Sequence, residues 1–484
     1  MSTLLKTDAQ IPLCVDLDGT LIRSDMLHES VMLLIKKSPL SMAALPFWLS
    51  SGKANLKRMI AERVELSVGS LPYRKEVLDM IATARNDGRR IILATAAPSL
   101  IAEAIADHLG IFDEVLSSSD SVNLAGVRKA DLLSARFGEG CFDYIGNDRV
   151  DIDVIKRARK GYLVSSGSRL RKSASKSCED VSFIDSSKGG LKSWIKAIRV
   201  HQWLKNGLIF IPALAAHEVG DFDTMSAATI AFISFCFCAS SVYILNDILD
   251  LPSDRVHKTK SRRPFASGDL PISSGLMIML LLLALSVGLA STLNYKFMIV
   301  LGFYYFVTLS YSLVLKKQVV VDVILLAGLY TTRILAGAAA TEIMPSFWLL
   351  AFSMFVFLCL AMVKRYSELR VSINSESMLA GRGYRPDDLP VIMSLGSSSG
   401  MVSVLILAMY MQSEDMTSMY PSSEWLWLTP PLMLYWITRL WLKAQRGEVD
   451  DDPVVFAARD WQSLTILGVM MATFLLAINN VVLW

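Results

Sequence analysis

The stretch that decides the fold is Asn246–Gly268, NDILDLPSDRVHKTKSRRPFASG, which follows an apolar run from Ala227 to Leu245. It begins with three carboxylates and then turns basic: Asp247, Asp250 and Asp254, followed by Arg255, Lys258, Lys260, Arg262 and Arg263. In a helix, spacings of three and four place these carboxylates on one face, although Pro252 tends to kink or end a helix. Clustered carboxylates repel one another unless a cation lies between them, and Mg²⁺ prefers such oxygen ligands together with substrate phosphates.

The stretch therefore predicts a diphosphate–Mg²⁺ site at the mouth of a membrane span, where the basic residues take the remaining phosphate charge. Ordinary positive charge in a cytoplasmic loop would explain the lysines and arginines, but not the three aspartates.

The same residues carry a resemblance. N-D-x-x-D-x-x-x-D followed by R-x-H-x-x-K-x-x-R-P resembles the first signature of the UbiA-type intramembrane prenyltransferases. The basic continuation and Arg199–Asn206, RVHQWLKN, resemble one branch, the decaprenyl-phosphate phosphoribosyltransferases, although that branch often has Pro in place of Lys258. The resemblance implies catalytic Asp247 and Asp250, which also bind the metal with Asp254. It implies that the substrate is bound by Lys205, Asn206, Asn246, Lys258, Arg262 and Arg263.

Composition divides the chain into two parts. At 484 residues it is too long for one ordinary domain, and it is charged and mixed up to about Lys196 but apolar in repeated runs beyond. The net charge of +3 is too small to indicate nucleic acid, and no basic patch is interleaved with aromatic residues. Nothing at the N-terminus resembles a signal peptide, so the first part is expected in the cytosol.

In the first part, buried strands are predicted at 11–17, 90–95 and 142–145, each followed by polar residues. Because open α/β sheets bind ligands at the carboxyl ends of their strands, these residues mark a site. The series resembles the haloacid-dehalogenase (HAD) phosphatases, a Rossmann-like α/β fold, over residues 1–168. The resemblance implies Asp16 as nucleophile, Asp18 as acid/base and Thr95 and Lys129 as phosphate ligands. The implied metal ligands are Asp16, Asp18, Asp151 and, as a helper, Asp148.

Helical residues at about 25–85 are expected to form a cap over this pocket. One departure is Asn147, which stands where that family usually has the first Asp of its metal motif. The alternative to live phosphatase chemistry is therefore a scaffold that has lost its activity. Residues 169–195, rich in Ser, Lys and Gly at first, are expected to form a flexible linker and an interfacial helix.

The second part, 196–484, is predicted to be an all-α bundle of nine transmembrane helices of UbiA type. We expect spans near 203–216, 225–246, 274–293, 297–315, 319–340, 346–366, 391–411, 425–442 and 462–483. Lys and Arg concentrate in alternate connections, which predicts a bacterial-type inner membrane protein with its N-terminal domain cytosolic and its C-terminus outside.

A second polar group is Lys364-Arg-Tyr-Ser-Glu368, at the end of the sixth expected span. A snorkelling Lys–Arg pair would explain its cations but not Glu368. The resemblance assigns Lys364, Arg365, Tyr366 and Glu368 to substrate binding. Arg333 lies within the fifth expected span, must find an anion inside the bundle and is a further candidate for substrate binding. Asp322 is either the partner of Arg333 or a site residue. Asp451-Asp-Pro-Val454 is either part of the phosphoribosyl branch's pattern or a simple turn.

We therefore expect a membrane enzyme that uses Mg²⁺ to transfer 5-phosphoribosyl from phosphoribosyl diphosphate to a polyprenyl phosphate. The HAD-like domain would then remove the 5-phosphate of the product. The alternatives are prenyl transfer from a polyprenyl diphosphate to a small aromatic acceptor, and a lipid-binding or transport protein without activity.

Overall fold

The computed structural model describes residues 11–119, 123–165, 167–178, 180–186, 189–257, 259–373, 383–413, 416, 419–449 and 452–479. The chain forms two compact units. The first comprises Met1–Ile198 and Tyr243–Met279, and the second comprises Arg199–Val242 and Leu280–Trp484. The long helix α11 (Phe222–Leu249) belongs partly to each unit.

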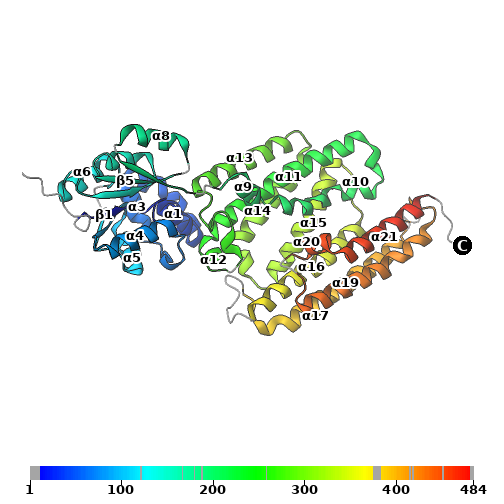
Figure 1. Cartoon of the computed structure of the whole chain (residues 1–484). Coiled ribbons are helices and arrows are strands. Elements are labelled where there is room, and N and C mark those ends of the chain that lie inside the picture. The colour runs from blue at the N-terminus through cyan, green and yellow to red at the C-terminus, as the bar shows by residue number, and fades with distance from the viewer. Residues whose placement is uncertain are drawn as a thin grey trace, which may run out of the picture. The chain divides into compact units, whose positions relative to one another are not determined.

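The first unit is built on a six-stranded parallel sheet in the order β3-β2-β1-β4-β5-β6. Strands β1 and β5 of this sheet are labelled in Figure 1. Its strands are β1 (Leu13–Val15), β2 (Ile91–Pro98), β3 (Glu114–Ser118), β4 (Asp143–Gly146), β5 (Lys160–Val164) and β6 (Val181–Ile184). In the register, Leu13 pairs with both Ile91 and Asp143, so β1 lies between the two other strands that the sequence predicts. All three predicted strands are confirmed, and their carboxyl ends meet at one edge.

Helices cover both faces of the sheet, because successive residues of a strand point to opposite sides. On one side Leu13 and Val15 pack with α4 (Lys75–Asn86) and α5 (Ser99–Leu109). On the other side Cys14 packs with α6 (Val127–Phe137), α7 (Ile152–Ile155) and α8 (Ser168–Ser177). The expected α/β fold with helices on both faces is confirmed, and α4, which begins inside the expected cap range, packs on the sheet.

A small helical cap is inserted after β1. It consists of α1 (Met26–Lys37), the 3-10 helix η2 (Pro39–Ala44), α2 (Leu45–Ser50), α3 (Lys53–Ala61) and the 3-10 helix η3 (Val68–Ser70). The side chain of Asp25 caps α1 by accepting a hydrogen bond from the backbone N–H of His28. Leu34, Trp48 and Ile60 form a core of the cap's own.

The expected linker is partly wrong. Within residues 169–195, α8 and β6 complete the sheet: β6 pairs with β5 through Gly161–Val181 and three further residue pairs. The Ser- and Lys-rich composition of α8 reflects a solvent-facing helix, since Ala174 is its buried residue and its other residues are partly or fully exposed. The expected interfacial helix is α9 (Leu191–Ile198).

The first unit also contains the segment that follows the apolar end of α11. It includes α12 (Leu251–Val256), the 3-10 helix η7 (Lys260–Arg262) and the start of α13 (Ile272–Ala290). Helix α11 ends at Leu249, and α12 begins one residue after Asp250 with Pro252 in its first turn. The predicted break at Pro252 is therefore confirmed, but Asp254 lies within the new helix.

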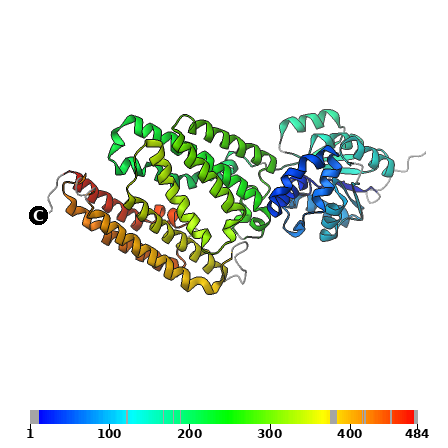
Figure 2. The same cartoon turned by 180° about the vertical axis from the view of Figure 1, so that it is seen from behind.

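The second unit is helical. Besides parts of α11 and α13 it contains α10 (Ile211–Ala215), α14 (Tyr295–Leu313), α15 (Val321–Thr341), α16 (Phe347–Ile373), α17 (Leu389–Met411), α19 (Thr429–Arg446), α20 (Pro453–Arg459) and α21 (Trp461–Ile478). Short 3-10 helices join them: η5 (Val200–Phe210), η6 (Glu218–Gly220), η8 (Leu315–Lys317), η9 (Pro386–Asp388) and η10 (Ser423–Leu428). Helices α17, α19 and α21 run side by side, as Figure 2 shows from behind.

Within the described residues, seven helices are long and apolar enough to cross a membrane, so the expected count of nine is not confirmed. The first expected span, 203–216, is a 3-10 segment followed by the five-residue helix α10. The eighth, 425–442, begins as η10, and its helix α19 ends with Arg439, Lys443 and Arg446, which is too much charge for an apolar window.

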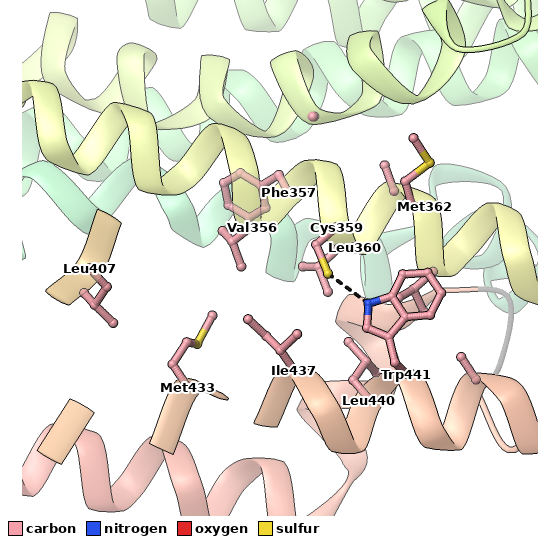
Figure 3. Packing of buried hydrophobic residues seen from close by; sticks show 14 of the residues in the cluster. Val356, Phe357, Cys359, Leu360, Met362, Leu407, Met433, Ile437, Leu440 and Trp441 are labelled. Atoms are coloured by element: carbon pink, nitrogen blue, oxygen red, sulfur yellow. Dashed lines mark hydrogen bonds between the residues drawn. The ribbon is translucent and has the colours of Figure 1, made fainter. Parts of the chain in front are cut away.

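The largest core of the second unit joins α16 to α17 and α19 (Figure 3). Cys359 of α16 accepts a hydrogen bond of 3.3 Å from the indole nitrogen of Trp441 on α19. A Cβ at Gly396 of α17 would lie 2.4 Å from the Trp441 ring, so only glycine permits this approach. Close packing here fixes α16, the helix that carries the Lys364–Glu368 group.

Candidate functional sites

At the sheet edge, the expected nucleophile and lysine meet. Lys129, from the first turn of α6, donates a hydrogen bond of 2.6 Å to Asp16 Oδ1 at the end of β1. The Lys129 ammonium also lies 3.7 Å from Asp151 Oδ1. Both groups are buried, with Asp16 7% and Lys129 3% exposed. A buried carboxylate is stable only with such a partner, so the pair is held in a fixed geometry.

Tyr144 joins this pair to the expected metal ligand. Its hydroxyl, on β4, accepts a hydrogen bond of 2.9 Å from Lys129 and donates one of 2.7 Å to Asp151 Oδ1. The other oxygen of Asp151 accepts the backbone N–H groups of Asn147 and Asp148 at 3.0 Å each. Tyr144 was not among the predicted site residues, because an aromatic residue inside a buried strand indicates only core packing.

Asn147 lies inside the site. Its side-chain oxygen accepts a hydrogen bond of 3.1 Å from the Thr20 hydroxyl, and a Cβ at Gly19 would lie 2.1 Å from its amide nitrogen. Gly19 also has a positive φ of 73°, which a residue with a side chain adopts with strain. Asn147 therefore lies beside the loop that follows Asp16, with an amide where the HAD family usually has a carboxylate.

Asp18 is positioned by the cap and not by the sheet. Its Oδ1 accepts the backbone N–H of Met26, the first residue of α1, at 2.8 Å. Burial raises the pKa of the Asp18 carboxyl to about 7, and the nearby charge of Asp25 adds to the rise. Burial likewise raises the pKa of Asp16 to about 6, against the opposing charge of Lys129. A carboxyl group with a pKa near neutrality suits a general acid or base.

Thr95 and Asp148, two further expected ligands, are near this edge with other contacts. Thr95 is fully buried on β2, and its hydroxyl accepts the backbone N–H of Ala97 at 3.0 Å. Asp148 caps the turn after β4 by accepting the N–H of Arg149 at 2.6 Å.

A cavity of about 170 Å³ adjoins the site between the cap and β2. It is lined by Ala54, Lys57, Arg58, Ala61, Glu62, Pro98, Ser99, Leu100, Ser118 and Ser119. Lys57 of α3 donates to the carbonyl of Ala96 at 2.7 Å and also lines a small pocket with Asp18. Lys57 was not among the predicted site residues, because a lysine in an amphipathic cap helix is usually exposed to solvent.

The three aspartates of the opening stretch are paired with cations of the chain. Arg263 donates to Asp247 Oδ1 at 3.0 Å and to Asp254 Oδ2 at 2.6 Å, so one guanidinium bridges two carboxylates. Lys36 of α1 donates to Asp250 Oδ1 at 2.8 Å and to the carbonyl of Leu249 at 3.0 Å. Burial raises the pKa of Asp254, partly offset by Arg263. The cations beside these carboxylates are therefore side chains of the chain itself, and the predicted Mg²⁺ role stays a prediction.

Other residues of the stretch are held nearby. Arg255 donates to both carboxylate oxygens of Glu29 on α1, at 2.8 and 2.6 Å, and both side chains are about 5% exposed or less. The Arg262 carbonyl accepts a hydrogen bond of 2.6 Å from Lys196. Asn246 lies in the last turn of α11, one residue before Asp247. Lys258 lies outside the described residues.

Within the described residues, no group of three or more His, Cys, Asp or Glu side chains is arranged closely enough to hold a metal ion. The donors nevertheless fit Mg²⁺ by their chemistry, since carboxylate oxygens are its preferred protein ligands. In both candidate sites these oxygens are paired with a cation of the chain, Lys129 in one and Arg263 and Lys36 in the other.

The second unit holds a separate polar group. Lys205 forms an ion pair with Asp452, and its ammonium lies over the Tyr330 ring, 5.7 Å from the centroid. Arg333 donates to the Asn206 side chain at 2.8 Å and to the Tyr304 hydroxyl at 3.3 Å. Lys364 belongs to the same group, because the charges of Lys205 and Asp452 act on it. Four residues that were expected to bind substrate therefore lie near one another: Lys205, Asn206, Arg333 and Lys364. For the segment that contains Asp452, the sequence left two alternatives: part of the phosphoribosyl branch's pattern, or a simple turn. In the structure Asp452 forms the ion pair with Lys205 and also caps α20.

Arg365 has a different environment. It is fully buried, pairs with Asp322 at 2.6 Å and also contacts Glu368. The Tyr384 hydroxyl donates to the other oxygen of Asp322 at 2.6 Å. Asp322 therefore pairs with Arg365, while Arg333 contacts Asn206, which the sequence alone could not decide. Tyr366 packs edge-on against Trp441, with ring centroids 5.8 Å apart, and belongs to the hydrophobic core.

Comparison with known proteins identifies the helical part. A model of the UbiA prenyltransferase family matches residues 207–464, more than half of the chain. The chain belongs to the UbiA prenyltransferase family. A model of haloacid dehalogenase-like hydrolases matches residues 13–143, so this UbiA protein carries an N-terminal HAD domain. Both resemblances expected from the motifs are confirmed, and with its seven candidate spans the UbiA protein is an integral membrane protein.

Three relatives are similar to this UbiA protein to different extents. The uncharacterized protein y4nM of Sinorhizobium fredii is 36% identical over 474 residues, 97% of this chain and 92% of that protein. The nodulation protein NoeC of Azorhizobium caulinodans is 34% identical over 284 residues, 58% of this chain and 91% of NoeC. The decaprenyl-phosphate phosphoribosyltransferase of Mycolicibacterium smegmatis is 37% identical over 182 residues, 37% of this chain and 57% of that enzyme.

Proposed function

We propose that this UbiA protein transfers the 5-phosphoribosyl group of phosphoribosyl diphosphate to a polyprenyl phosphate, with Mg²⁺ as cofactor. The observation that carries the proposal is the 37% identity to a decaprenyl-phosphate phosphoribosyltransferase over 182 residues. The charges agree with it, because the donor carries a diphosphate and a further phosphate, and two groups of buried or half-buried cations are present, one in each unit.

The Asp247 group is assigned to the diphosphate. Asp247, Asp250 and Asp254 would hold Mg²⁺, which supplies positive charge to the leaving diphosphate. Arg263 contacts two of these carboxylates, and a guanidinium at this place would also be able to bind a phosphate oxygen. Arg262 and Asn246, which adjoin this group in sequence, are assigned to the same substrate.

The group around Lys205 and Arg333 is assigned to the remaining anions of the substrates. Lys205, Lys364 and Arg333 are three cations beside Asn206, Asp452 and three aromatic rings. Such a half-apolar surrounding strengthens the attraction between a cation and a phosphate. Glu368, which contacts Arg365, is assigned to orienting this group.

The transfer needs no strong base. A phosphate oxygen of the lipid attacks the anomeric carbon of the ribosyl group, the bond from that carbon to the diphosphate breaks, and diphosphate leaves with the electron pair. The lipid phosphate is already an anion, so the residues act by binding, orientation and charge stabilisation.

The HAD domain is proposed to remove the 5-phosphate of the ribosyl lipid. Asp16 attacks the phosphorus and forms an aspartyl-phosphate while Asp18, with its raised pKa, protonates the leaving ribosyl oxygen. Water then hydrolyses the acyl phosphate. Lys129 and Thr95 are the phosphate ligands, and Asp151, with Asp148, completes the expected Mg²⁺ site. Joining both activities in one chain raises the effective concentration of the intermediate at the HAD domain.

Lipid products test both steps. Membranes containing the chain are incubated with labelled phosphoribosyl diphosphate, polyprenyl phosphate and Mg²⁺, and the organic extract is separated. Wild type is expected to yield the dephosphorylated ribosyl lipid, and Asp16→Asn the phosphorylated one. If wild type stops at the phosphorylated lipid, the HAD step is wrong and the transfer stands.

A further inference from the structure

The cap of the HAD domain presents apolar side chains to solvent. In the short helices η2 and α2, Leu40 is 88%, Met42 54%, Phe47 73% and Leu49 49% exposed. Elsewhere in the same domain, exposed apolar residues such as Leu100, Val127 and Val150 are scattered along the chain. Four exposed apolar residues within ten positions concentrate apolar surface in one short segment, here called the patch, and such surfaces mark contact regions.

The segment that presents this patch has a defined conformation. Trp48, between Phe47 and Leu49, points inward to the cap core and lies under the Arg63 guanidinium at 4.9 Å. The Asn55 side chain donates to the Trp48 carbonyl at 3.2 Å, which ties α2 to α3. Because Trp48 is anchored, its neighbours in sequence are directed outward.

The charges next to the patch in sequence are of one sign. Residues 38–52 contain no charged side chain, and between Glu29 and Glu62 all charged residues are basic: Lys36, Lys37, Lys53, Lys57 and Arg58. Lys37 and Lys53 flank the patch on its two sides and are exposed. An apolar tip with an aromatic residue and flanking lysines complements the anionic surface of a bilayer, where aromatic residues enter the headgroup region and lysines meet lipid phosphates.

The chain itself brings this surface to a membrane, because seven helices among the described residues are long and apolar enough to span one. We propose that the segment Pro39–Ser50 is a membrane-docking element, in which Leu40, Met42, Phe47 and Leu49 enter the headgroup region of an anionic bilayer. The element continues directly into α3, whose Lys57 lines the cavity beside Asp18. Docking therefore holds the entrance of the HAD pocket at the lipid surface, whatever phosphate ester the domain hydrolyses.

Spin labels on the full chain in lipid nanodiscs test this proposal. The background carries Cys141→Ser and Cys178→Ser, which remove the two partly exposed cysteines. The four remaining cysteines are all buried. Nitroxides are attached at Leu40→Cys and Phe47→Cys, with Val150→Cys, 50% exposed in the turn after β4, as the control. Accessibility to oxygen, which concentrates in lipid, is compared with accessibility to a water-soluble nickel complex.

With phosphatidylglycerol in the discs, labels at 40 and 47 are expected to be open to oxygen and shielded from nickel, whereas the label at 150 is open to nickel. Lys37→Gln with Lys53→Gln should weaken docking by roughly 25-fold, since each lysine near an anionic surface is worth roughly fivefold in binding. Nickel accessibility at 40 and 47 equal to that at 150 would overturn the proposal. Shielding from both reagents would also overturn it, because it indicates a protein surface, such as a second copy of the chain.

Discussion

Replacing Tyr144 by Phe removes one hydroxyl from the HAD site and leaves its surroundings in place. The ring is fully buried in the sheet core, and Phe fills the same volume. The lost hydroxyl links Lys129 at 2.9 Å with Asp151 at 2.7 Å. The variant therefore isolates the contribution of this link.

The magnitude follows from these contacts. A hydrogen bond to a charged group contributes about 1.5–3 kcal/mol. In the variant, Lys129 keeps its hydrogen bond of 2.6 Å to Asp16, and Asp151 keeps the hydrogen bonds that it accepts from two backbone N–H groups. Lys129 and Asp151 therefore each lose one hydrogen bond of several. We expect about 2 kcal/mol, which corresponds to a roughly 30-fold lower kcat if the loss is felt in the transition state.

The assay is Mg²⁺-dependent hydrolysis of p-nitrophenyl phosphate by the full chain in detergent. Tyr162→Phe, a change of the same kind on neighbouring β5, is the matched control and should retain wild-type kcat. A Tyr144→Phe variant with the kcat of this control would refute the argument that the hydroxyl orients Lys129 and Asp151.

Three further predictions concern other parts of the molecule. Asp247→Asn should abolish the ribosyl lipid in the membrane assay while the chain still inserts into membranes; near wild-type turnover in Mg²⁺ would exclude the metal role. Glu368→Gln should raise the KM for phosphoribosyl diphosphate more than that for the lipid, measured by varying each substrate, and the reverse pattern would move this group to the lipid. Asp143→Ala should destabilise the HAD domain by about 3–5 kcal/mol, because it leaves Arg89 and Arg159 without the buried carboxylate that binds both. This change is measured as the midpoint temperature of thermal unfolding, with the loss of p-nitrophenyl phosphate hydrolysis as the readout. A midpoint equal to that of the wild type would contradict the prediction.

Much of the fold follows from the sequence, because its signals are local. The strand before Asp16 and the strands ending at Thr95 and Gly146 are short apolar runs followed by polar residues, and each lies where expected. Spans such as 225–246 are long apolar runs within a single helix. Strand β6 was missed because its neighbours are Ser- and Lys-rich, and an edge strand needs little apolar sequence.

The sites were predictable in part. The motifs pointed to Asp16 and Lys129, which the fold brings together, and to the Asp247 group, whose metal role stays a prediction. Long-range pairs were not predictable: Arg333 could have paired with Asp322, but the fold brings Arg365 to that carboxylate. Tyr144 and Lys57 gain their roles only from what the fold places beside them.

The central claim is transfer of the ribosyl group to the lipid. Membranes carrying the wild-type chain, given phosphoribosyl diphosphate labelled in the ribose together with polyprenyl phosphate, should yield a labelled organic-soluble lipid that requires Mg²⁺. The label should be lost with EDTA and in Asp247→Asn. Absence of labelled lipid from wild type, together with product from a polyprenyl diphosphate and an aromatic acid in the same membranes, would contradict the account and favour prenyl transfer.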